Sequence, residues 1–148
     1  MNLQDSIIIK SGRQTVWNAL NNPAVLQACI PGCINLKGDP KNGFEATVNQ
    51  KVGPVRATFK GKVTLSDIVK NESYTISGEG KGGAAGFAKG LARVKLDETA
   101  DGTKLSFDAE AKVGGRIAQL GARLIDGFAK NMAKKFFEQF KHELEKIG

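Results

Sequence analysis

The hydrophobic positions in the C-terminal part of the chain follow a helical period and change face partway along. From Arg116 to about Lys146 there is no proline and no loop signal, which predicts one long helix. At about 100° per residue, a first apolar face gives way to a second face centred roughly 130° away. The first face contains Ile117, Leu120, Leu124, Ile125, Phe128 and Met132, and the second contains Phe136, Phe137, Phe140, Leu144 and Ile147. We therefore expect this helix to meet two different apolar environments.

The N-terminal segments predict a strand followed by two short helices. Residues 3–10 are rich in β-branched side chains and are expected to form a strand. A helix is predicted over residues 13–21, and a second begins at Pro23, where proline occupies its favoured first position, and runs to about Cys29. Pro31 and Gly32 end it.

The middle of the chain alternates apolar and polar side chains with period two, which is typical of an antiparallel sheet with one dry face. The alternating segments are 44–49, 55–65, 74–79 and 105–113. Turn signals at 41–43, 70–72 and 101–102 separate them. This order of elements predicts an α+β fold in which a curved antiparallel sheet surrounds the long C-terminal helix. We expect residues 1–148 to form a single domain.

Small side chains recur on the apolar face of the predicted strands. They are Ala46, Ala57, Gly61, Gly78, Ala109 and Ala111. Such positions either let the helix approach closely or leave a cavity, and the sequence alone leaves both possibilities open. Repeated glycine inside strands weakens them and favours a bent sheet around a space.

A glycine-rich stretch over residues 78–90 formally contains a GxGxxG motif. A dinucleotide site requires that motif between a strand and a helix, whereas here strands are predicted on both sides. The stretch is therefore interpreted as strand, turn and strand, with glycines at the bends.

Composition narrows the classes of partner. The net charge of +7 favours anionic partners, either lipid or acidic protein, but no aromatic residues interleave with the basic ones as a nucleic-acid stacking surface requires. No apolar run is long enough to span a bilayer, and the first residues lack the pattern of a secretory signal. We expect a cytoplasmic location.

No cluster of residues predicts catalysis or metal binding. The lone histidine, His142, has no evident partner, and the Cys29/Cys33 pair is too small a ligand set for zinc. These cysteines are interpreted as two small, partly buried residues around the Pro-Gly turn. The sequence favours binding over chemistry, and we expect no catalytic residue, no metal and no intrinsic cofactor.

Several motifs together resemble the family of the carbon monoxide dehydrogenase G-subunit. They are VWNALNNP (16–23), CIPGC (29–33), KVGPV (51–55), FKGKV (59–63), GEG (78–80), GGAAGFA (82–88), VGG (113–115) and QLGARLIDG (119–127). The family resembles the START and birch-pollen-allergen superfamily, with its helix-grip fold. The resemblance implies a non-catalytic accessory protein for carbon monoxide dehydrogenase or a related molybdenum hydroxylase, which helps to connect the enzyme to the inner face of the membrane.

The resemblance further implies an apolar cavity for a lipophilic molecule such as a quinone or another lipid. The expected lining residues are Val55, Phe59, Phe87, Leu91, Leu120, Leu124 and Phe128. Two alternatives are an interaction module with a filled core that docks on the dehydrogenase, and an enzyme of the cyclase or hydrolase kind. The absence of clustered acids and bases disfavours the enzyme.

The second helix face has two interpretations. An apolar strip beside lysines suits an anionic membrane surface or an acidic partner. The residues expected there are Lys130, Lys134, Phe137, Phe140 and Lys141. Alternatively, this end of the helix packs on the first strand or on the two short helices.

Overall fold

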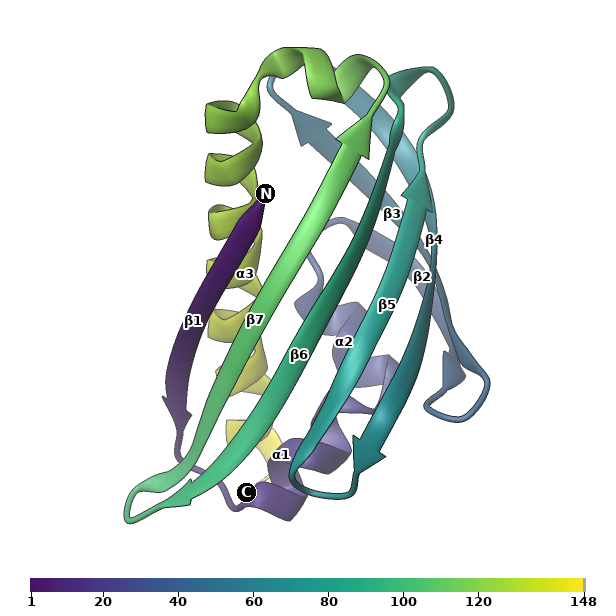
Figure 1. Ribbon diagram of the computed structural model, residues 1–148. Helices are drawn as coiled ribbons and strands as arrows, with labels where there is room; N and C mark the ends of the chain where they lie inside the picture. The colour runs from purple at the N-terminus through teal and green to yellow at the C-terminus, as the bar shows by residue number, and fades with distance from the viewer. Residues whose placement is uncertain (148) are drawn as a thin grey trace.

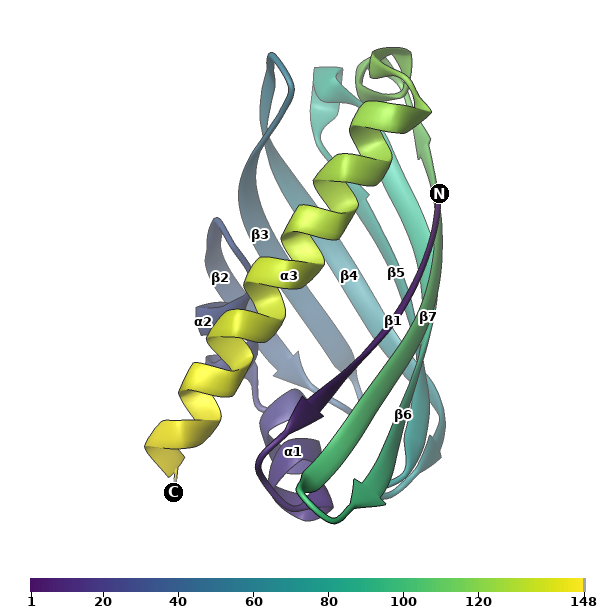
Figure 2. The same cartoon turned by 90° about the vertical axis from the view of Figure 1, so that its left-hand side faces the viewer.

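Seven antiparallel strands form one curved sheet in the order β1-β7-β6-β5-β4-β3-β2, and helix α3 lies across its concave side (Figures 1 and 2). The computed structural model describes residues 1–147. The strands are β1 (Asn2–Ile9), β2 (Cys33–Asp39), β3 (Gly43–Val52), β4 (Val55–Val69), β5 (Ser73–Lys81), β6 (Phe87–Thr99) and β7 (Gly102–Gly114). The helices are α1 (Arg13–Leu20), α2 (Pro23–Cys29) and α3 (Ala122–Ile147), with 3-10 helices η1 (Gly83–Ala85) and η2 (Arg116–Leu120). The predicted α+β helix-grip architecture is confirmed.

The predicted single helix from Arg116 is wrong at its start. Residues 116–120 form the short helix η2, and α3 begins only at Ala122. Between them Gly121 has a φ of 93°, a left-handed conformation that glycine adopts without steric cost. Ile117 and Leu120 therefore do not lie on the wheel of α3. The change of apolar face along the helix concerns α3 alone.

The main core lies at the end of the molecule that contains α1 and α2. Its buried residues are Ile9, Val16, Trp17, Ala19, Leu20, Val25, Cys29, Tyr74, Val94, Leu96, Leu105, Phe140 and Leu144. Phe136 and Phe137 pack against this core, and the Phe137 ring stacks on Phe107 of β7 with centroids 5.3 Å apart. Phe136, Phe137, Phe140 and Leu144 of the second apolar face therefore pack on the protein's own interior, which confirms the packing interpretation for them, whereas Ile147 is exposed.

Both cysteines are free thiols near the Pro-Gly turn, Cys29 buried and Cys33 half-buried, in agreement with their interpretation as small packing residues. Burial, and then the charge of Glu143, raises the pKa of the Cys29 thiol to about 11. Burial also raises the pKa of Cys33.

Replacing Phe140 by alanine tests how α3 is anchored. Its side chain is fully buried and stacks on Phe136 at a centroid distance of 5.9 Å. We expect Phe140→Ala to lower the free energy of unfolding by about 3–5 kcal/mol, measured by chemical denaturation. Ile147→Ala is the control, because Ile147 is 60% exposed, and it should change the stability little. Equal effects of the two variants would contradict this packing.

Thiol alkylation tests the burial of Cys29. Because the raised pKa keeps the thiol protonated until the pH approaches 11, its thiolate is scarce at pH 8. We expect iodoacetamide to modify Cys29 in the native protein roughly 100-fold more slowly than in the denatured protein, by peptide mass spectrometry. Raising the pH toward 11 at constant fold should restore the rate. Equal rates in both states at pH 8 would refute the buried placement.

Candidate functional site

Glycine and alanine occupy most of the inward positions in the middle of the concave sheet face, beside Phe44, Val63 and Val113. In β6, Ala88 and Gly90 alternate with exposed lysine and share the face of buried Val94. Cross-strand pairing aligns the inward positions of β3 to β7 with them, in two neighbouring rows. We call the small residues of these rows the small-residue floor: Ala46, Gly61, Gly78, Gly80, Ala88, Gly90 and Ala111.

Helix α3 does not contact the glycines at the centre of this floor. A Cβ atom added at Gly80 would have one heavy atom within 4 Å, the backbone oxygen of Lys60 at 3.9 Å. At Gly61 and Gly78 the atoms within 4 Å also belong to neighbouring strands. The small residues therefore do not serve a close approach of the helix. All seven residues of the floor also remain partly exposed, which indicates that the side chains of α3 do not fill the region above them.

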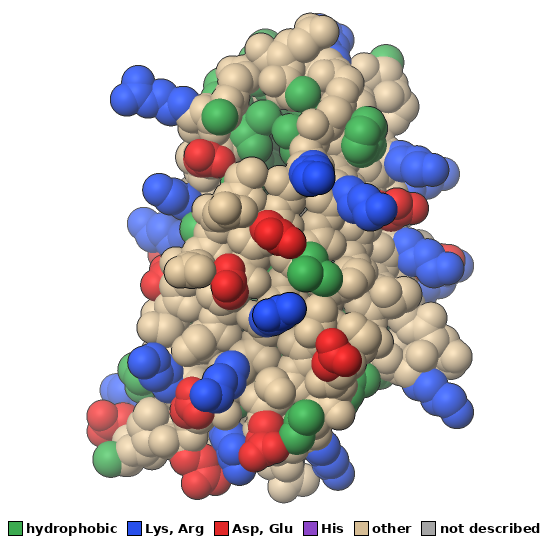
Figure 3. Space-filling view, viewed as in Figure 1, with side chains coloured by type: hydrophobic (Ala, Val, Ile, Leu, Met, Phe, Trp, Pro, Cys, Tyr) green, Lys and Arg blue, Asp and Glu red, His purple; other side chains and the backbone are tan. Residues whose placement is uncertain are grey.

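Two apolar clusters bound this space. The main core closes it at the end with α1 and α2. At the other end lies what we call the upper cluster: Val52, Val55, Ala85 and Ile117, which are buried, and Ala57, Phe59, Val113, Leu120 and Phe128, which pack against them. Figure 3 shows hydrophobic side chains at the base of a recess near the upper end of the molecule. The space above the floor is thus bounded by apolar side chains at both ends.

Four of the seven predicted lining residues come together in the upper cluster: Val55, Phe59, Leu120 and Phe128. Phe59 also lies under the glycine-rich turn, because a Cβ at Gly82 would overlap its ring. Leu124 is 39% exposed and lies at the rim, with its Cδ1 atom 3.3 Å from the position of a Cβ at Gly53.

Phe87 and Leu91 do not line this interior, which corrects their predicted placement. Both have the opposite parity to Ala88 and Gly90 in β6, so they face the outer side of the sheet. Leu91 lines a shallow outer groove together with Lys89 and Glu110. Phe87 is 49% exposed, and its ring lies over Gly114, where it would block a Cβ.

The residues expected to face a membrane or partner on α3 separate into two groups. Phe140 is fully buried in the main core, so its expected exposure is wrong. Phe137 is half-buried and lines, with Lys130, Lys134 and Lys141, a groove of about 540 Å³ between α3 and β1. Leu3, Ile7 and Phe107 complete its apolar side. The sequence placed Phe137 beside these lysines, but it could not predict the groove because the other wall comes from the opposite end of the chain.

The described residues offer little for acid–base or metal chemistry at the interior. Tyr74 is buried in the main core beside the Trp17 ring, and burial raises the pKa of its hydroxyl, so it stays protonated. His142 is exposed on α3, 3.9 Å from the Glu145 carboxylate. Across residues 1–147, no group of three or more His, Cys, Asp or Glu side chains is placed to hold a metal ion. Within the same residues, no helix is long and apolar enough to cross a membrane.

Comparisons with solved structures identify proteins with the same fold. A conserved protein from Geobacillus kaustophilus has 28% sequence identity and a TM-score of 0.91, over 99% of this chain and 96% of that chain. A protein from Rhizobium loti has 16% identity and a TM-score of 0.73, over 97% and 96% of the two chains. A protein from Mesorhizobium loti has 15% identity and a TM-score of 0.72, over 100% and 99%. The last two show the fold alone.

The comparison with family models gives the relationship that the motifs had indicated. No match is found among curated proteins. Residues 6–145, however, match the model of CoxG, the carbon monoxide dehydrogenase G-subunit. The match covers all seven strands, in whole or in part, as well as the small-residue floor and the upper cluster. The chain therefore belongs to the CoxG family.

Proposed function

We propose that this protein binds a lipophilic molecule, such as a quinone or another lipid, in the space between the small-residue floor and α3. The observation that carries the proposal is the uncovered face of Gly61, Gly78 and Gly80, where α3 contributes no atom within 4 Å of an added Cβ. An unfilled interior bounded by apolar side chains favours a ligand that is held mainly by burial.

The chemistry of the walls supports an apolar ligand with few polar anchors. The floor itself carries no side chain larger than a methyl group, and the upper cluster supplies the aromatic rings of Phe59 and Phe128. An isoprenoid chain or a quinone ring gains stability in such a site at roughly 25 cal/mol per Å² of apolar surface removed from water. The protein is non-catalytic in this proposal, and it binds its ligand without changing it.

The family indicates where such a ligand would be used. As a member of the CoxG family, the protein is proposed to associate with a carbon monoxide dehydrogenase or a related molybdenum hydroxylase. Its role is to link that enzyme to a lipophilic molecule of the membrane. In this role the protein acts in the cytoplasm, with peripheral contact at the inner face of the membrane.

Filling the floor tests the proposal. Gly80→Leu directs a branched side chain into the space, and Ser77→Leu on the same strand directs one to the outer face as a matched control. We expect Gly80→Leu to fold with undiminished stability, because a strand glycine is replaced and space is available. We expect it to lose binding of a short-chain ubiquinone or menaquinone, measured by native mass spectrometry, whereas Ser77→Leu retains it.

The same pair of variants separates the competing accounts. In a filled core, Gly80→Leu would overpack the interior and cost about 1–3 kcal/mol, and the wild-type protein would bind neither quinone. That result would favour an interaction module over a ligand carrier. Solvent extraction of the protein from its own host provides a second measurement, because a carrier is expected to co-purify with a lipid or isoprenoid.

A further inference from the structure

The turns at the end of the molecule that carries the upper cluster contain basic residues and no acidic ones. This end is formed by the β3–β4 turn, the η1 turn, and η2 with the first turn of α3, which all lie at the top in Figures 1 and 2. Gly86 lies against Gly114 and Gly115, and Gly53 against Leu124, so these turns are in contact. Residues 51–61, 80–90 and 111–125, which build this end, contain eight Lys and Arg residues and no Asp or Glu residue, and Glu79, Glu110 and Asp126 lie at the borders of these ranges.

Like charges face each other directly across neighbouring strands at this end. The pairs are Lys51 with Arg56, Lys60 with Lys81, and Lys89 with Lys112. Like charges directly opposite each other on one sheet face destabilise the fold. Lys89 also has Glu79 as a cross-strand neighbour, but within residues 1–147 none of these six cations has a carboxylate oxygen within 4.0 Å. The arrangement is unfavourable for the isolated protein, and an anionic partner would relieve it.

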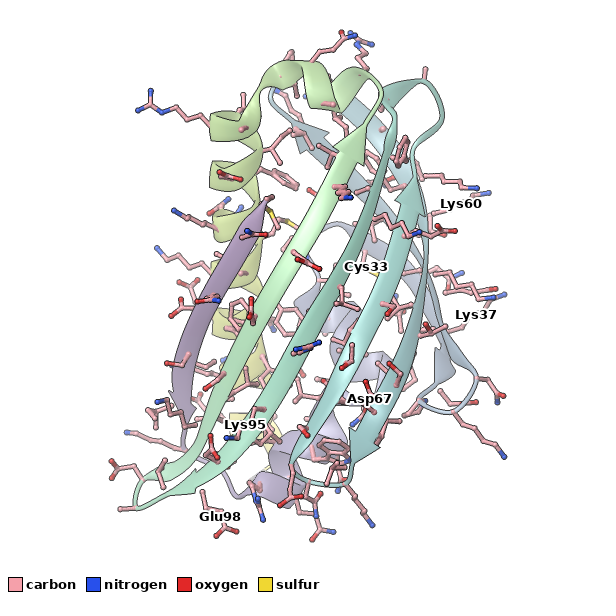
Figure 4. All side chains as sticks on the ribbon, in the orientation of Figure 1. Cys33, Lys37, Lys60, Asp67, Lys95 and Glu98 are labelled. Carbon is pink, nitrogen blue, oxygen red and sulfur yellow. The ribbon has the colours of Figure 1, made fainter. Side chains whose placement is uncertain are left out.

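An exposed aromatic ring lies among these cations. Phe87 is opposite Lys81 in the sheet and is 49% exposed on the outer face. Leu124, 39% exposed, extends the apolar surface at the rim. Figure 3 shows Lys and Arg side chains around the upper part of the outer face, and Figure 4 shows Lys60 projecting away from the sheet. We call this surface the cationic end: Lys51, Arg56, Lys60, Lys81, Phe87, Lys89, Lys112, Arg116, Arg123 and Leu124.

We propose that the cationic end docks on an anionic lipid bilayer, with Phe87 and Leu124 entering the headgroup region. Lysines dominate the like-charged pairs, and lysine is depleted from protein–protein interfaces, whereas flexible lysines beside apolar side chains suit a layer of lipid headgroups. This surface gives the membrane contact of the proposed function a location. It lies at the opposite end of the molecule from the part of α3 around the buried Phe140.

Docking at the cationic end also determines which end of the interior faces the bilayer. The upper cluster, with Val55, Phe59 and Leu120, lies directly beneath the cationic end. A lipophilic molecule that left the bilayer there would reach the small-residue floor by passing this cluster alone. This last step rests on the proposed function, whereas the docking itself requires no ligand.

Charge reversal at the cationic end tests the docking. Each Lys near an anionic leaflet contributes about fivefold to the partition constant. Lys60→Glu combined with Lys81→Glu should therefore weaken binding to vesicles of phosphatidylglycerol and phosphatidylcholine at least about 25-fold. The matched control is Lys10→Glu with Lys70→Glu, which gives the same net charge from exposed positions outside the cationic end, and it should bind nearly as well as the wild type. Sedimentation with vesicles that contain no quinone measures both.

A single variant separates docking from folding. Lys81→Glu places a carboxylate opposite Lys60, so the midpoint of thermal unfolding should stay constant or rise while vesicle binding falls. Phe87→Ser should weaken the part of the binding that remains at high salt.

The docking proposal is overturned if wild-type protein fails to bind anionic vesicles, if both double variants lose binding equally, or if the cationic end binds only an acidic protein. Quinone binding without vesicle binding would overturn this inference and leave the proposed ligand binding intact.

Discussion

The anchoring of α3 by its C-terminal half is the interaction on which the rest of this structure depends. Phe140 and Leu144 are 0% and 2% exposed, and they bind the helix to α1, α2 and the ends of β6 and β7. Near its other end the helix packs on the upper cluster through Phe128. Between these two contacts the helix spans the small-residue floor. The volume between the sheet and the helix therefore depends on the small size of the side chains in the floor.

The residues that stabilise the fold and the residues proposed to bind partners therefore lie in different halves of the molecule. Glycine inside a strand costs roughly 0.5–1 kcal/mol relative to alanine, and the floor contains four such residues. The like-charged pairs of the cationic end add a further unfavourable contribution. Both occur in the half of the molecule away from the main core, whose tightly packed residues offset them. Strained or weakened regions of this kind are expected where a protein binds a partner rather than where it holds itself together.

Sequence patterns predicted the architecture because alternation and helical period report directly on burial, but they failed where one residue changes the geometry. Gly121 interrupts what the pattern presents as a continuous helix, since its positive φ is invisible in the apolar period. Phe87 and Leu91 were expected to line the cavity because they lie in or beside the glycine-rich stretch. The parity of buried Val94 and Leu96 along β6 would have assigned them to the outer face, together with Lys89. Whether the small residues allowed close packing or left a space required the actual position of α3, which depends on contacts between distant parts of the chain.

Xenon binding in crystals tests the central claim most directly, because xenon enters apolar cavities that stay free of protein atoms. The account predicts xenon above Gly61, Gly78 and Gly80, between the sheet and the first half of α3, or else a bound lipid that excludes it from that position. A crystal structure in which side chains of α3 lie against these three glycines, with neither xenon nor lipid between them, would contradict it.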